Sequence, residues 1–127
     1  MKLTARWWRF NLVGAIGVPL QLASLAILRL WFAAHYLLIT FAAVEFTLLH
    51  NFIWHLHYTW KDRRSHSALP QLCRFHLSNG LVSIVGNLML MRVFVRGVGL
   101  PLLPANALAI FCCSIANFCL ANVWAFA

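Results

Sequence analysis

The sequence predicts an all-α integral membrane protein, a four-helix bundle made of two parallel two-helix repeats. Three observations predict it. Hydrophobic residues make up 63% of the 127 residues and charged residues only 9%, with a mean hydropathy of +0.81. Four long apolar segments occupy most of the chain, and its two halves resemble each other. A soluble domain carries about 25% charged residues, so this composition suits a protein whose surface faces lipid.

The four apolar segments are each long enough to cross a bilayer. A spanning helix needs about 20 predominantly apolar residues. We therefore expect one domain, residues 1–127, with spans at about 10–28, 36–56, 75–91 and 104–126. The second span contains Glu45, and a polar stretch at 61–67 separates the second span from the third.

Basic residues near the span ends predict the orientation, because they are retained on the cytoplasmic side. Seven flank one side, namely Lys2, Arg6, Arg9, Lys61, Arg63, Arg64 and Arg74. Three flank the other, namely Arg29, Arg92 and Arg96. We expect a multi-pass protein of the cytoplasmic (inner) membrane with both termini in the cytoplasm. The net charge of +8 then favours membrane lipid with anionic headgroups as a partner, and not nucleic acid.

The two halves of the chain share short motifs in the same order. Residues 9–12, Arg-Phe-Asn-Leu, match residues 74–77, Arg-Phe-His-Leu, at an offset of 65. Asn51-Phe52 followed by residues 58–60 matches Asn117-Phe118 followed by residues 124–126, at an offset of 66. Each repeat is a pair of helices, so both repeats begin on the same side of the membrane. They are therefore predicted to be parallel, related by a pseudo-two-fold axis along the membrane normal.

These motifs are similar to those of the GtrA-like family. The resemblance covers essentially the whole chain and rests on its order of motifs: Arg9-Phe10-x-x-Val13-Gly14, Asn51-Phe52, Tyr58-Thr59-Trp60, and Asn117-Phe118-x-x-x-Asn122-x-Trp124-x-Phe126. It implies a small four-span protein of cell-surface polysaccharide synthesis that moves polyprenyl-phosphate-linked sugars across the membrane. It also implies an alternative, a membrane partner of a glycosyltransferase. One position departs from the family: Leu56 replaces an Asn that Asn122 keeps in the second repeat.

Polar residues inside the spans are candidates for a path along which the substrate passes. Glu45 lies near the middle of the second span, where a carboxylate is costly and is either functional or held neutral by hydrogen bonds. Asn79, Ser83 and Asn87 recur every four positions of the third span, and Asn106 and Asn117 share a face of the fourth. Such residues can line a groove for a sugar phosphate or hold helices together.

Basic and aromatic residues at the helix ends complete the predicted site. Arg9 and Arg74 occupy equivalent places in the repeats, and arginine suits bidentate phosphate contact, although orientation signals alone would also explain them. The predicted substrate-binding residues are Glu45, Arg9, Arg74, Asn51, Asn79, Asn87, Asn117, Asn122, Trp60 and Trp124.

The sequence carries no enzymatic signature, so we expect neither an enzyme nor a cofactor. No nucleophile–base–acid set and no glycine-rich phosphate loop is visible. His50, Trp54 and His57 share a helix face, but they lack the HExxH spacing of a zinc site, and no metal is expected.

Three functions therefore remain open. One is translocation of a polyprenyl-phosphate sugar, for which a homodimer would provide more room. Another is a non-transporting partner of a glycosyltransferase. The third is a small proton-coupled exporter, which is disfavoured because the first span of this chain has no acid.

Overall fold

The chain folds into two compact helical units, and each unit corresponds to one of the two sequence repeats. The computed structural model describes residues 1–64 and 67–127, without the side chains of residues 36, 37, 102, 103 and 106. The units are Met1–Arg64 and Ser65–Ala127. In the described part of the chain every regular element is a helix, which confirms the predicted all-α membrane helical bundle.

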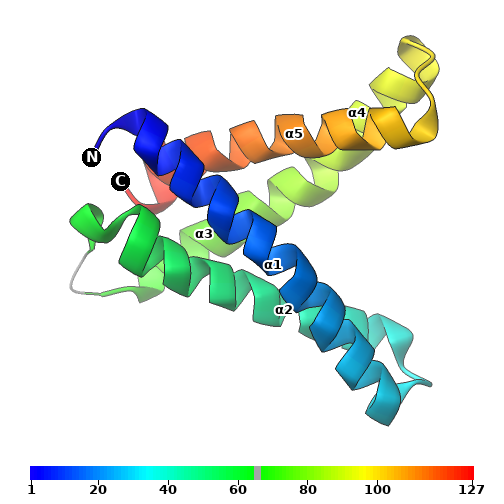
Figure 1. The fold of residues 1–127 in the computed structure, drawn as a ribbon, viewed down its shortest axis with the longest axis horizontal. Helices are drawn as coiled ribbons and strands as arrows, with labels where there is room; N and C mark the ends of the chain where they lie inside the picture. The colour runs from blue at the N-terminus through cyan, green and yellow to red at the C-terminus, as the bar shows by residue number, and fades with distance from the viewer. Residues whose placement is uncertain (65–66) are drawn as a thin grey trace. The chain divides into compact units, whose positions relative to one another are not determined.

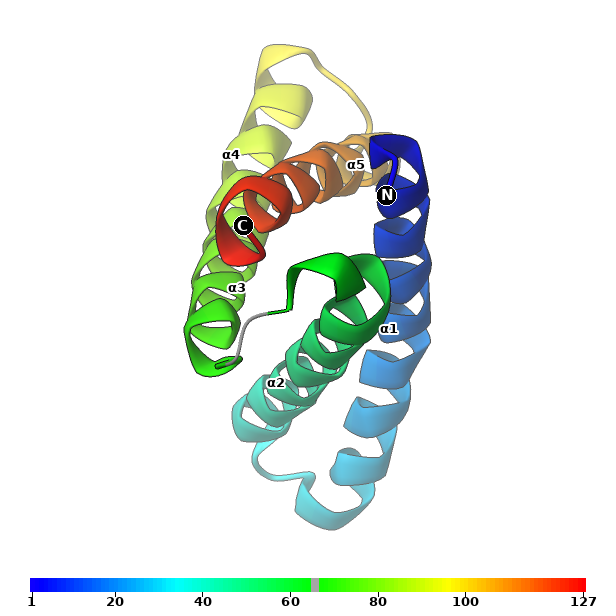
Figure 2. The same ribbon diagram turned by 90° about the vertical axis from the view of Figure 1, so that its left-hand side faces the viewer.

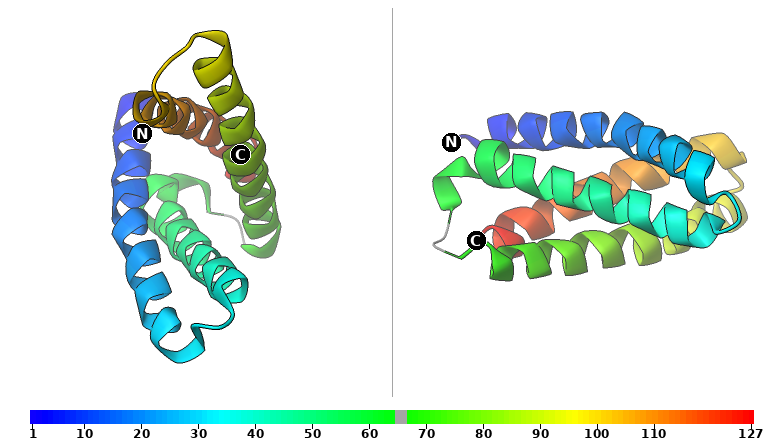
Figure 3. Two further views of the ribbon diagram at one scale, coloured as in Figure 1. Left: turned by 90° about the vertical axis from the view of Figure 1, so that its right-hand side faces the viewer. Right: turned by 90° about the horizontal axis from the view of Figure 1, so that it is seen from below.

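The first unit is an antiparallel helix pair (Figure 1). Helix α1 spans Leu3–Phe32 and α2 spans Tyr36–Trp54, and a three-residue connection joins them. A π-helical turn at His55–Thr59 extends α2, followed by a single 3₁₀ turn at Lys61–Arg63. The start of α1 and the end of α2 therefore lie at the same end of this unit (Figure 3).

The second unit repeats this design. Helix α3 (Leu69–Leu81), a π-helical turn (Val82–Gly86), α4 (Asn87–Arg92) and another π-helical turn (Val93–Gly97) follow one another without a break. Helix α5 (Leu102–Leu120) returns alongside them and ends in a π-helical turn at Ala121–Ala125 (Figure 2). Gly99 makes the connection possible, because its φ of 81° is a conformation that residues with a Cβ rarely adopt.

Within the part of the chain that the structure describes, three helical stretches are long and apolar enough to cross a membrane: Leu3–Phe32, Leu69–Gly97 and Ala107–Ala125. The first two extend beyond the predicted spans 10–28 and 75–91, because the residues that flank each apolar run, several of them basic, remain helical. Helix α2 is the fourth helix. Glu45 lies on this helix, and two of the three histidines at its end belong to the π-helical turn that follows it.

The helices of each unit pack through small residues and aromatic rings. The buried side chains of the first unit include Phe10, Val13, Ile39, Ala43, Phe52 and Trp60, and those of the second include Phe75, Ala105, Ala109, Cys113, Phe118 and Phe126. Large apolar side chains such as Leu22, Phe41 and Leu88 are exposed, as expected on a surface that faces lipid.

Candidate functional site

The sequence repeat is also a repeat of contacts at one end of each unit. In the first unit the ring centroids of Phe10 and Trp60 lie 6.1 Å apart. In the second unit the ring centroids of Phe75 and Phe126 lie 6.0 Å apart. Both closing rings are fully buried. Each follows a π-helical turn, in which the Trp60 amide donates to the His55 carbonyl and the Phe126 amide to the Ala121 carbonyl, both at 2.8 Å. In each unit, therefore, the last helical turn packs on the first helix of that unit through an equivalent contact.

The two candidate phosphate-binding arginines also contact equivalent atoms. Arg9 donates from Nη1 to the Tyr58 carbonyl at 2.9 Å, and its guanidinium carbon lies 4.6 Å from the centre of the Tyr58 ring. Arg74 donates from Nη1 to the Trp124 carbonyl at 3.5 Å. Basic side chains commonly cap the free carbonyls at a helix C-terminus. Each arginine thus uses one guanidinium nitrogen to cap a helix end. The other N–H groups of each guanidinium are further donors for an anion.

The sequence did not single out Arg6, yet the structure makes it the most buried charged residue among the described residues, with 3% of the whole residue's surface exposed. It donates to both carboxylate oxygens of Asp62, at 3.0 and 2.9 Å, and to the Thr59 carbonyl at 3.3 Å. These hydrogen bonds hold the pKa of Asp62 down, at about 2. The pair ties the start of α1 to the chain that follows α2. The only sequence signal was one acid in a basic loop.

Three histidines near the end of the first unit make local contacts, and one of them is buried. His55 is buried, with its ring stacked 4.9 Å from that of Phe10 and its Nδ1 3.0 Å from Thr59 Oγ1. His50 accepts from the Trp54 indole at 2.9 Å, and His57 contacts the Ile53 carbonyl of its own helix. The described residues contain no group of three His, Cys, Asp or Glu side chains placed to hold a metal ion.

The candidate asparagines differ in burial and in their hydrogen bonds. Asn51 packs against Gly17 of α1, where a Cβ would lie 2.7 Å from the Asn51 Oδ1. Asn87 donates to the Ser83 carbonyl at 2.7 Å. The Oδ1 atoms of Asn87 and Asn117 are buried, and neither has a hydrogen-bond donor among the described residues. Asn79 and Asn122 are half-buried, and the Asn106 side chain lies outside the described residues.

The remaining candidates lie at different places in their units. Glu45 is half-buried on α2. Trp60 is fully buried in the closing contact of the first unit. Trp124 is 39% exposed and corresponds to Tyr58, since both provide the carbonyl that an arginine caps. The structure therefore separates Trp60, a packing residue, from Trp124, whose ring remains accessible.

Comparison with known proteins identifies the family. The family model described as GtrA/DPMS, transmembrane domain, matches residues 9–126. That match begins at Arg9 and ends at Phe126, two residues of the repeated end contacts. No curated protein sequence matches the chain. The chain belongs to the GtrA/DPMS transmembrane-domain family, whose members take part in lipid-linked sugar handling and membrane glycan synthesis.

Proposed function

We propose that the chain translocates a polyprenyl-phosphate-linked sugar across the cytoplasmic membrane for polysaccharide or cell-envelope glycan synthesis. The observation that carries this proposal is the pair of buried amide oxygens on Asn87 and Asn117, which lack a donor within the described structure. Leaving a buried acceptor unsatisfied costs about 1–3 kcal/mol. A sugar hydroxyl is a donor that would satisfy such an oxygen.

The register of the second unit places these two oxygens at different depths. Cys113 on α5 contacts Val82 through a 3.7 Å hydrogen bond and lies against Gly86. Asn117 lies one turn beyond Cys113 toward the start of α3, whereas Asn87 lies beyond Gly86 in the opposite direction. At 1.5 Å per residue, the two positions are about 10 Å apart along the helix axis. A headgroup with several hydroxyls can move from one to the other, while its polyprenyl chain stays in lipid.

Glu45 is the candidate carboxylic acid of the first unit, near the middle of the second predicted span. It is one of two acids in the chain. An acid at this depth can accept hydroxyl hydrogen bonds or exchange a proton during each cycle. At the helix ends, Arg9 and Arg74 provide the planar donors that suit a phosphate.

The test is to replace Asn117 with Leu and measure both stability and flipping in proteoliposomes. If the Asn117 oxygen is kept for substrate, removing it leaves the melting temperature unchanged or raises it, because an unsatisfied acceptor is lost. Flipping of a polyprenyl-phosphate sugar should fall at least about tenfold, the effect of roughly one hydrogen bond. Asn11→Leu is the matched control, since the Asn11 amide donates to the Trp7 carbonyl of its own helix. Normal flipping by Asn117→Leu would contradict the proposal.

A second candidate function is a membrane partner of a glycosyltransferase. The description of the matching family supports it, because that description joins GtrA with the transmembrane domain of DPMS. In this case the reconstituted wild type shows no flipping, whereas a co-expressed glycosyltransferase leaves the membrane fraction when the chain is deleted.

A further inference from the structure

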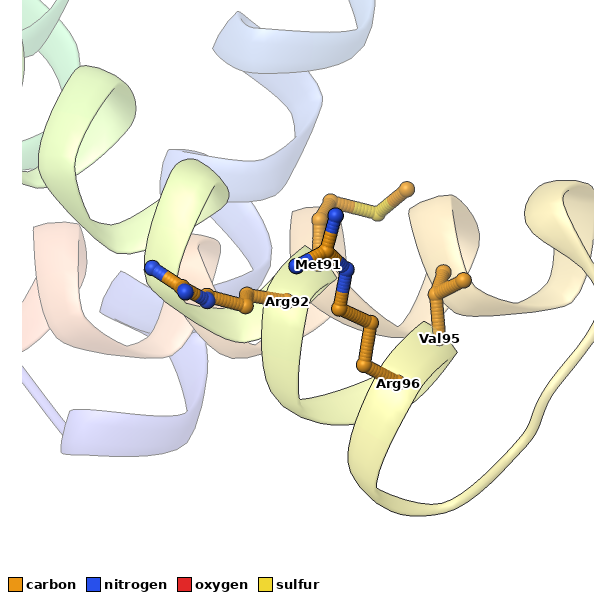
Figure 4. A pocket seen from close by; sticks show the side chains of 4 residues that line it. All are labelled: Met91, Arg92, Val95 and Arg96. Atoms are coloured by element: carbon orange, nitrogen blue, oxygen red, sulfur yellow. The ribbon is translucent and has the colours of Figure 1, made fainter.

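The second unit carries an open basic pocket at the C-terminal end of the continuous helix Leu69–Gly97, far from Arg74. Met91, Arg92, Val95 and Arg96 line this pocket, which has a volume of about 540 Å³ (Figure 4). The four side chains come from two successive helical turns. The Arg96 side chain runs back along the helix toward Met91 and Arg92.

The charge of this pocket is not compensated within the described structure. Arg92 and Arg96 are exposed, and the one described ion pair joins Arg6 and Asp62 in the other unit. Residues four apart on a helix are neighbours, about 5–6 Å between Cβ atoms, so both guanidinium groups can reach a single anion. Arginine presents a planar fork of donors that matches phosphate oxygens.

The pocket is also partly apolar and lies where basic residues are unexpected. Met91 and Val95 are half-buried between the arginines and offer a surface to a hydrocarbon chain. In the predicted orientation this end faces away from the cytoplasm, where arginine opposes the usual distribution of basic residues. A ligand with a phosphate on a lipid chain accounts for both features.

We infer that Arg92 and Arg96 form a second binding site for the phosphate of the lipid carrier, at the membrane face opposite Arg74. This inference rests on the proposed function and deepens it. A phosphate that is translocated would leave a basic group at one membrane face and bind a second basic group at the opposite face. Arg74 and the Arg92–Arg96 pair lie near opposite ends of the same continuous helix, Leu69–Gly97.

The test measures binding and not transport, so its outcome is independent of the flipping assay. The full chain in nanodiscs of phosphatidylcholine is titrated with farnesyl monophosphate as a short carrier analogue. Arg92→Lys combined with Arg96→Lys keeps both charges but removes both forks, and should weaken binding at least about tenfold. Arg29→Lys is the matched control, since Arg29 is an exposed arginine in the last turn of α1, in the other unit. It should leave binding unchanged.

Competition separates the possible sources of the phosphate. The inference expects farnesyl monophosphate to bind in the presence of excess inorganic phosphate, and in nanodiscs that also contain phosphatidylglycerol. Full displacement by inorganic phosphate would overturn it in favour of a free-anion site, and full displacement by phosphatidylglycerol in favour of a bulk-lipid site. Unchanged binding by the double variant, or equal weakening by Arg29→Lys, would also overturn it. A wild type that binds in this way but does not flip would refute only the proposed function.

Discussion

Arg6 is a charge that the fold removes from solvent, and Asp62 is its counterion. The Arg6 side chain is 4% exposed and that of Asp62 is 41% exposed. Taking one partner away from such a pair leaves the other charge buried and unpaired, which costs more than the pair contributes when intact. The pair therefore holds the end of the first unit closed, and its loss should be visible as loss of stability.

Asp62→Asn should lower the stability of the purified protein by about 1–3 kcal/mol, measured as a lower melting temperature at pH 7. The wild type has a second signature. The pKa of Asp62 in the folded state is held at about 2, below its ordinary value. The stabilisation is therefore present above about pH 4 and is lost as the pH falls from there toward 2. Asp62→Asn should remove this part of the acid dependence, whereas Lys61→Gln, at an exposed neighbour, should keep it.

Glu45 allows transport and packing to be separated at a single residue. Glu45→Gln keeps the shape and the hydrogen-bonding capacity of the side chain but cannot titrate. We expect this variant to fold and insert, and to lose most flipping in reconstituted vesicles in which the wild type flips. Thr47→Val is the control on the same helix, since the Thr47 hydroxyl donates to the Ala43 carbonyl of its own helix. Equal flipping by wild type and Glu45→Gln would make Glu45 a structural residue.

At the scale of the helices, close approach depends on particular glycines. Gly17 faces Asn51 and Gly86 faces Cys113, whereas Gly14 and Gly80 have open space at the Cβ position. The first pair sets how closely α1 and α2 pack. The sequence alone does not distinguish Gly14 from Gly17, because both lie on an apolar helix three residues apart.

Gly17→Ala should destabilise the first unit by about 1–3 kcal/mol, because the new Cβ would lie 2.7 Å from Asn51 Oδ1. Gly14→Ala, where a Cβ meets nothing within 4 Å, should instead be neutral or stabilise by up to about 1 kcal/mol through helix propensity. Thermal unfolding in detergent measures both. Adding Asn51→Ala to Gly17→Ala should recover part of the loss, and strict additivity of the two substitutions would show that they do not meet.

At the scale of the whole molecule, the distribution of basic residues predicts both termini and the central loop in the cytoplasm. In a chain whose four native cysteines are replaced, a cysteine at the exposed Ser67 should be protected from an impermeant thiol reagent in intact cells. A cysteine at the exposed Val98, in the turn before α5, should be labelled. The reverse pattern would invert the orientation, and with it the face assigned to Arg92 and Arg96.

The sequence by itself determined the class of protein, the positions of the helices, the two repeats and their family. These properties depend on local features: runs of apolar residues, charges at their ends, and short motifs at a fixed offset. The predicted orientation rests on the same local charges. Even so, the first and third helical stretches extend beyond the predicted spans 10–28 and 75–91, since a helix does not end where its hydrophobic run ends.

Only the tertiary structure decided what individual polar and aromatic residues do. Arg6 and Asp62 lie 56 positions apart in the sequence, and no local sequence pattern predicts that they pair. Trp60, the last residue of its motif, is buried, whereas Trp124, the first residue of the equivalent motif, is exposed. Asn51 packs against a glycine, while the buried oxygen of its counterpart Asn117 has no hydrogen-bond donor among the described residues. The physical reason is that a side chain's role depends on which atoms of a distant helix it meets, and helix packing alone sets those neighbours.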